Sequence, residues 1–174
     1  MSHLLTWAAR APQAGEFWEV GVHRGLSATV LAQMAPGVLR LFDTFAGRPE
    51  AGPEDHPCST SRFADTSLAF VRRRVLEAQP DAQIVYHVGT VPETFAGTED
   101  AQVAFAYVDL DLYAPTRAAI AWIWPRLVPG GILLVDDCCG TICASAWPGV
   151  AKAVATFPAL PWRQDQQRMV AIHA

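Results

Sequence analysis

The sequence has few charged residues and no long apolar run. Only 17% of its 174 residues are charged, and the formal net charge is −4. The opening residues, MSHLLTWAARAPQ, lack a basic leader followed by a long apolar stretch, and apolar runs such as GILLV end within a few residues at a charge or a proline. We therefore expect neither a membrane span nor a secretory signal, which indicates a cytoplasmic protein.

Basic clusters and metal-type cysteine pairs are also scarce. The basic run VRRRV (71–75) is short, and the excess of acidic residues leaves no basic face for a nucleic-acid backbone. The four cysteines are Cys58, Cys138, Cys139 and Cys143, without the paired spacings of a zinc site. We expect free thiols, no nucleic-acid partner and no membrane partner.

What the sequence does contain is an alternation of short apolar runs with helix-length segments. With 51% hydrophobic residues, 174 residues are enough for the core of one domain, which we expect to span 1–174. The alternation is typical of βαβ units around a mostly parallel sheet. Strands are expected at 17–22, 38–43, 83–88, 103–110 and 131–137, and helices at 26–35, 66–79 and 115–127.

The end of the chain follows a different pattern. Residues 162–167 and 168–174 are two runs with almost no spacer, which predicts an antiparallel hairpin at the edge of the sheet. The predicted fold is therefore α/β, a doubly wound, mostly parallel seven-stranded sheet with an antiparallel C-terminal hairpin, which is the Rossmann-like methyltransferase variant. The segment 46–62 is rich in Pro, Gly and charge, and predicts a mobile surface loop beside the site.

The loop after the first predicted strand indicates which cofactor the sheet binds. Its sequence is EVGVHRGLS (19–27), with His23 where a dinucleotide-binding loop needs its second glycine. This arrangement suits S-adenosylmethionine instead: Gly21 gives the tight turn, the helix N-terminus faces the methionine carboxylate, and Ser27 adds a hydroxyl. The alternative is a glycine turn that only lets the helix pack on the strand. The cofactor residues predicted here are Glu19, Gly21, Gly25 and Ser27.

A second part of the predicted cofactor site lies at the end of the second strand. Asp43 follows Gly21 by 22 residues and is placed to accept hydrogen bonds from two ribose hydroxyls. It could also cap the short turn TFAG, and the two roles are compatible. Four neighbouring residues complete the prediction: Thr44, Phe45, Gly89 and Thr90.

Four aspartates follow two apolar strands, in VDLDLY and LLVDD. Asp109, Asp111, Asp136 and Asp137 are expected at one edge of the sheet, where unneutralised carboxylates would repel one another. A hard divalent cation such as Mg²⁺ resolves this repulsion, because it prefers oxygen ligands. The alternative, that each acid caps a helix N-terminus, suits them singly but not all four together.

Several motifs resemble one known family in their order along the chain. EVGVHRG, DTFAG, FADTSLAFVRRRV, VDLDLYAPT, LVPGGILLVDD and PGVAKAVATF are similar to the macrocin O-methyltransferase (TylF-like) family of metal-dependent methyltransferases, which act on sugars of antibiotics. The resemblance runs from about Glu16 to the C-terminus. It implies Mg²⁺ held by Asp109, Asp136 and Asp137, and Asp111 as the general base.

Some roles stay open at this stage. His23, His56 and His87 are rival bases, and His87, at a strand end before the GT loop, is the strongest of them, although such a histidine is more often structural. Cys138 and Cys139 are expected to line the pocket rather than bind the cation.

Two functions are compatible with these observations. One is metal-dependent transfer of a methyl group from S-adenosylmethionine to a hydroxyl of a small molecule, a sugar or another acceptor with neighbouring oxygens. The other is a non-catalytic binding or accessory domain, because family members usually carry a longer N-terminal helical region that helps to form the acceptor pocket and the oligomer. A homodimer is compatible with either.

Overall fold

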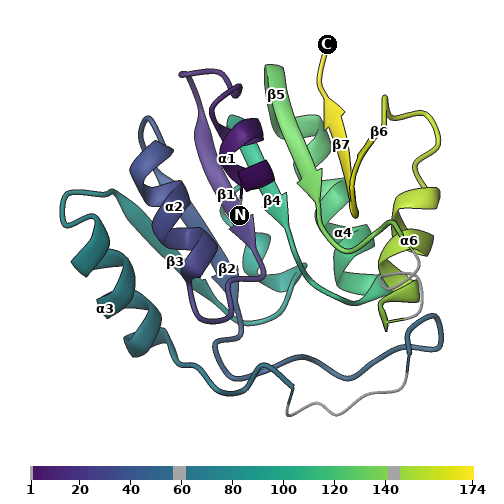
Figure 1. Cartoon of the computed structure of the whole chain (residues 1–174), viewed down its shortest axis with the longest axis horizontal. Helices are drawn as coiled ribbons and strands as arrows, with labels where there is room; N and C mark the ends of the chain where they lie inside the picture. The colour runs from purple at the N-terminus through teal and green to yellow at the C-terminus, as the bar shows by residue number, and fades with distance from the viewer. Residues whose placement is uncertain (1, 57–61, 141–145) are drawn as a thin grey trace.

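The computed structural model describes residues 2–56, 62–140 and 146–174, and shows one seven-stranded sheet (Figure 1). The strand order is β3-β2-β1-β4-β5-β7-β6. The first five strands are parallel, whereas β7 pairs antiparallel with both β5 and β6, which confirms the predicted fold class. The strands are β1 (Glu16–Val20), β2 (Leu39–Asp43), β3 (Ile84–Val88), β4 (Val103–Val108), β5 (Leu127–Val135), β6 (Arg163–Asp165) and β7 (Arg168–Ile172).

Helices cover both faces of this sheet, as expected for a doubly wound fold. One face carries α1, α2 and α3, and the other carries α4 and α6 (Figure 1). The bounds are α1 (Ser2–Ala8), α2 (Leu26–Met34), α3 (Leu68–Ala78), α4 (Tyr113–Ile123) and α6 (Pro148–Ala155), with short 3-10 turns η1 (Glu93–Phe95) and η2 (Trp124–Arg126).

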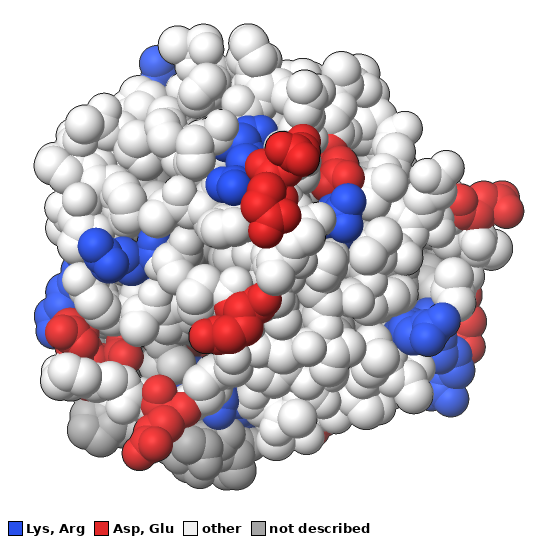
Figure 2. Space-filling view, turned by 180° about the vertical axis from the view of Figure 1, so that it is seen from behind, with Lys and Arg blue, Asp and Glu red and all other residues white. Residues whose placement is uncertain are grey.

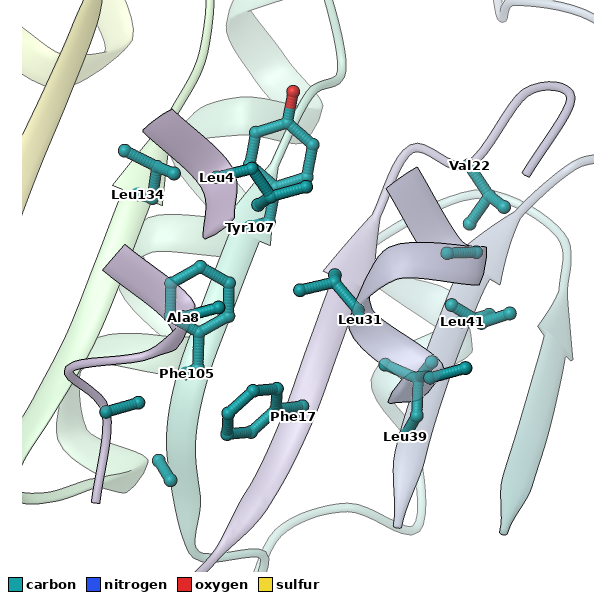
Figure 3. Packing of buried hydrophobic residues seen from close by; sticks show 14 of the residues in the cluster. Leu4, Ala8, Phe17, Val22, Leu31, Leu39, Leu41, Phe105, Tyr107 and Leu134 are labelled. Atoms are coloured by element: carbon teal, nitrogen blue, oxygen red, sulfur yellow. The ribbon is translucent and has the colours of Figure 1, made fainter. Parts of the chain in front are cut away.

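The central strand β4 shows why the sheet is easy to predict. All six of its residues, VAFAYV, are buried, because helices cover both of its faces. Alternate side chains therefore enter two separate cores. On the face of α1 and α2, the rings of Phe17 and Phe105 lie 5.3 Å apart (Figure 3). On the opposite face, Trp18 packs 5.0 Å from Phe42.

The structure adds two helices that the sequence patterns do not predict, α1 and α6. Helix α1 is short, and it is held by contacts with the distant hairpin: Trp7 Nε1 donates to Asp165 Oδ2 at 2.7 Å, and His3 Nδ1 lies 3.0 Å from the same oxygen. The predicted helix at 115–127 is divided into α4 and η2. The predicted strands 103–110 and 131–137 end earlier, at Val108 and Val135, so the four aspartates lie in the loops beyond them.

The segment between β2 and α3 runs along the carboxyl edge of the sheet from β2 to α6 and back (Figure 1). Asp55 Oδ1 accepts the backbone N–H of Tyr113 at 2.7 Å, and Lys152 Nζ donates to the carbonyl oxygen of Glu54 at 2.8 Å. These contacts place the segment over the site. Residues 57–61 of the predicted loop, with Cys58, and also Cys143, lie outside the described residues.

The face drawn in Figure 2 shows no large basic patch. That face, which lies behind the view of Figure 1, carries scattered acidic and basic side chains of mixed sign. Among residues 2–56, 62–140 and 146–174, no helix is both long and apolar enough to cross a bilayer.

Candidate active site

The glycine loop after β1 is packed directly against the loop after β4. Gly21 has a φ of 93°, and a Cβ atom there would lie 2.0 Å from the carbonyl oxygen of Asp109. The backbone N–H of Gly21 donates to the carbonyl oxygen of Phe42 at 2.9 Å, and the N–H of Asp109 donates to that of Val20 at 2.8 Å. The predicted tight turn is therefore present, and it needs glycine for both its conformation and its space.

Asp43 holds this glycine loop with its carboxylate. Its Oδ2 accepts the backbone N–H groups of Val22 at 2.6 Å and His23 at 2.9 Å, and its Oδ1 accepts that of Phe45 at 2.7 Å. The last bond is the turn cap that the sequence allowed. Asp43 also lines the cavity described below. Since two carboxylate oxygens offer about four acceptor positions, the three backbone donors leave about one, and Thr44 Oγ1 lies 3.4 Å from Oδ1.

Glu19 is buried behind the glycine loop. Ser27 Oγ donates to Glu19 Oε1, while Glu19 Oε2 has no hydrogen-bond partner among the described residues. Burial, and then the nearby carboxylates of Asp109 and Asp43, raise the pKa of Glu19 well above its ordinary value. Glu19 thus supports Ser27 from inside the fold, and Ser27 lines the cavity.

Three of the four predicted aspartates form a tight group. One carboxylate oxygen each from Asp109, Asp111 and Asp137 lies within 4.8 Å of the others. Asp111 and Asp137 reach this position through left-handed backbone, with φ of 63° and 54°. Burial and the neighbouring Asp136 raise the pKa of Asp109, and burial with Asp137 raises the pKa of Asp111 to about 7. This donor set fits a hard cation, which would relieve the repulsion.

Asp136 differs from its prediction as a cation ligand. Its Oδ2 forms an ion pair with Arg168 Nη2 at 2.9 Å and accepts the hydroxyl of Tyr107. Its Oδ1 accepts the backbone N–H of Asp137 at 2.9 Å and the side chain of Gln167 at 3.3 Å. All four acceptor positions of this carboxylate are therefore occupied by the protein itself.

A single cavity of about 270 Å³ connects the glycine loop with the aspartate group. The predicted residues that line it are Gly21, Ser27, Asp43, Thr44, Gly89, Thr90, Asp109, Asp111 and Asp137. The structure thus brings together residues from five separate loops at the carboxyl edge of the sheet. This is the edge at which doubly wound sheets bind their ligands.

Other predicted residues do not reach this cavity. The ring of His87 stacks on Phe42 at 4.3 Å, and its Nε2 lies 3.5 Å from Arg40 Nη1. His87 lies one position before the end of the edge strand β3, and burial lowers its pKa. Phe45 packs into the core and Gly25 against Val71.

The expectation for the paired cysteines also fails. Neither Cys138 nor Cys139 lines the cavity. The Sγ of Cys138 donates to the carbonyl oxygen of Val135 at 3.2 Å, and both backbone N–H groups donate to the carbonyl oxygen of Gln167 at 2.9 Å. The pair therefore anchors the hairpin to the loop after β5.

Among the cavity-lining residues that sequence reasoning missed are Arg48, Phe63 and Trp147. They come from the segment between β2 and α3 and from the residue before α6. The guanidinium of Arg48 lies 5.3 Å from the ring of Trp147, and Phe63 lies 6.3 Å from the same ring. Their positions depend on loop conformation, for which the sequence gives no periodic signal.

Two curated proteins are similar to this chain. The mycinamicin III 3''-O-methyltransferase of Micromonospora griseorubida is 28% identical over 166 residues, covering 84% of this chain and 64% of the relative. The 8-demethyl-8-(2,3-dimethoxy-alpha-L-rhamnosyl)-tetracenomycin-C 4'-O-methyltransferase of Streptomyces olivaceus is 28% identical over 150 residues, covering 76% and 56%. The chain therefore spans less than two thirds of the length of either relative.

Solved structures share the fold. The calicheamicin methyltransferase CalS11 matches with a TM-score of 0.80 and 24% identity, over 99% of this chain and 79% of that one. The O-methyltransferase NovP matches with a TM-score of 0.79 and 21% identity, over 99% and 78%. The family described as "Methyltransferase domain" matches residues 18–138. Because this match includes most of the sheet and the whole glycine loop and aspartate region, the chain belongs to that methyltransferase family.

Proposed function

We propose that the chain is an S-adenosylmethionine-dependent O-methyltransferase that acts on a hydroxyl of a small molecule, a sugar with a neighbouring oxygen in natural-product biosynthesis. The observation that carries this proposal is the single cavity that joins the glycine loop to the aspartate group. The named activities of the two curated relatives, both O-methyltransferases, support the same reaction. The sequence motifs resemble those of the macrocin-type members.

The cofactor would lie against the glycine loop. Gly21 and the first turn of α2 face the cavity, so the N-terminus of α2 would meet the methionine carboxylate, and Asp43 would accept a ribose hydroxyl. Ser27, which donates its hydroxyl to Glu19, supports this turn. Thr44, Gly89 and Thr90 complete the wall on the β2 and β3 side. Bound S-adenosylmethionine would supply a methyl group on a sulfonium, whose carbon an oxygen nucleophile can attack in line with the thioether as leaving group.

A hard cation such as Mg²⁺ would be held by Asp109 and Asp137. Mg²⁺ is commonly bound by one or two carboxylates and keeps its other positions for water and substrate. Asp136, whose acceptor positions are all occupied, would orient Asp137 through the bond to its backbone N–H. The cation would supply charge that lowers the pKa of the acceptor hydroxyl.

Asp111 would take the proton of that hydroxyl. It lies beside Asp109 and Asp137 and lines the cavity. As the acceptor oxygen bonds to the methyl carbon and the carbon–sulfur bond breaks, the proton passes to Asp111 and S-adenosylhomocysteine remains. A purely binding or accessory role has less support, because such a domain has no need for buried carboxylates that repel one another.

Turnover with a panel of acceptors tests this proposal. The panel should contain rhamnosides, other glycosides with neighbouring hydroxyls, and catechol, and release of S-adenosylhomocysteine should be followed with Mg²⁺ and with a chelator. We expect turnover that chelation abolishes, and an Asp111→Asn variant that binds cation and cofactor normally but turns over about 10²- to 10⁴-fold more slowly. Turnover that survives exhaustive chelation would remove the cation from the proposal, and loss of cation binding in Asp111→Asn would make Asp111 a ligand.

A further inference from the structure

Arg48 is a buried cation without a hydrogen-bond partner. Only 7% of its surface is exposed, and none of its three guanidinium nitrogens has a hydrogen-bond partner among residues 2–56, 62–140 and 146–174. A buried charge that lacks such partners lowers stability by several kcal/mol, on the order of the cost of breaking a buried ion pair. A buried arginine of this kind therefore indicates a ligand that supplies the missing hydrogen bonds.

The surroundings of Arg48 place it at the aspartate end of the cavity. Its side chain lines the cavity, and its guanidinium lies 5.3 Å from the ring of Trp147. The charges of Asp111 and Asp55 act on it most strongly among the acids. Its backbone N–H donates to the carbonyl oxygen of Arg62 at 3.1 Å, and the Arg62 guanidinium lies 4.5 Å from the same Trp147 ring.

The acids near Arg48 already have other partners. Asp55 accepts the backbone N–H groups of Tyr113 at 2.7 Å and Gly52 at 3.0 Å. Asp111 lies beside Asp109 and Asp137, where it would take the proton of the acceptor hydroxyl. Arg62 beside it adds a second positive charge. The protein itself therefore does not neutralise the charge of Arg48, and this part of the cavity attracts a further anion.

We infer that the acceptor carries an oxyanion, a phosphate or a carboxylate, close to the hydroxyl that is methylated, and that Arg48 binds this oxyanion. The inference rests on the proposed methyl transfer and names the class of its substrate. A guanidinium binds either oxyanion through two parallel N–H bonds. Because the nitrogens are shielded from solvent in the unliganded protein, the flexible side chain would turn toward the cavity that it already lines.

Binding of small oxyanions to the cofactor-free protein tests the inference without turnover. Phenyl phosphate and benzoate are titrated by calorimetry in the absence of divalent cation, with phenyl glucoside as the neutral probe. The variants are Arg48→Gln and Arg48→Lys, and Arg72→Gln is the matched control, because Arg72 lies 5.5 Å from the Tyr86 ring and outside the cavity. Binding of S-adenosylhomocysteine is measured separately for every variant.

We expect at least one oxyanion to bind the wild type. Its affinity should be about tenfold or more lower in Arg48→Gln, intermediate in Arg48→Lys and unchanged in Arg72→Gln. Comparison of phenyl phosphate with benzoate decides which oxyanion is preferred. Arg48→Gln should also leave the melting temperature unchanged or higher, since it removes a buried charge. Equal oxyanion binding in Arg48→Gln and wild type, or no oxyanion binding by the wild type, would overturn the inference. A selective loss of S-adenosylhomocysteine binding in Arg48→Gln would assign Arg48 to the cofactor instead.

Discussion

Asp43 carries two functions that can be separated by experiment. Its carboxylate accepts the backbone N–H groups of Val22, His23 and Phe45 at 2.6, 2.9 and 2.7 Å. A hydrogen bond to a charged group contributes roughly 1.5–3 kcal/mol. Asp43→Ala removes three of them, but water from the cavity can replace part of the loss, so we expect the free energy of unfolding to fall by about 3 kcal/mol.

The ribose function of Asp43 is tested with the cofactor rather than with the protein. Three backbone donors leave about one acceptor position, so one ribose hydroxyl and not two should bind. We therefore expect either the 2′-deoxy or the 3′-deoxy analogue of S-adenosylhomocysteine, but not both, to bind the wild type about tenfold or more weakly. Asp43→Asn should lose this discrimination. If both analogues bind like the parent compound, Asp43 serves the loop alone and the ribose assignment is refuted.

Three further perturbations follow from the same site. Gly21→Ala should abolish binding of S-adenosylhomocysteine and lower the melting temperature, because its Cβ would lie 2.0 Å from a carbonyl oxygen, whereas Gly37→Ala, with open space around it, should do neither. Asp136→Asn should lower the free energy of unfolding by about 3 kcal/mol, by weakening a buried ion pair, and change Mn²⁺ affinity in calorimetry less than Asp137→Asn does. The folded-state pKa of Asp111 is raised from 3.8 to about 7. In cation-free protein this residue should therefore make the free energy of unfolding fall as the pH rises through that window. In Asp111→Asn, the free energy of unfolding measured in urea should depend less on pH over the same window.

The fold could be predicted from the sequence because its central strands, such as β1 and β4, are buried on both faces. Runs such as VAFAYV cannot be surface strands, and their spacing leaves room for a helix between them. Helix α1 could not be predicted in this way, because it has seven residues and depends on bonds from Trp7 and His3 to Asp165 at the other end of the chain. Short helices of this kind are stabilised by tertiary contacts rather than by their own propensity.

The location of the site could be predicted from the sequence, but the contacts between its side chains could not. The rule that parallel strands end at one edge is enough to bring Asp109 and Asp137 together. The orientation of neighbouring side chains is another matter: Asp137 adopts a left-handed φ of 54°, and Asp136 is drawn to Arg168 on β7. Neither the local backbone conformation nor a partner more than thirty residues away has a signal in the motif itself. Arg48 lies in a loop and was missed for the same reason.

One contact fixes the position of the glycine loop relative to the aspartate group. Gly21 lies so close to the carbonyl oxygen of Asp109 that the two loops cannot move independently, and the hydrogen bond from the Asp109 N–H to the Val20 carbonyl fixes them from the other side. A side chain at position 21 would push the Asp109 backbone away, and would displace the carboxylate of Asp109 together with it. In the proposed reaction, Gly21 would therefore set the distance between the methyl donor and the oxygen that accepts the methyl group, in addition to forming the turn. For an in-line displacement, in which small misplacements of the reacting atoms cost large factors in rate, this shared contact is the part of the fold that chemistry depends on most directly.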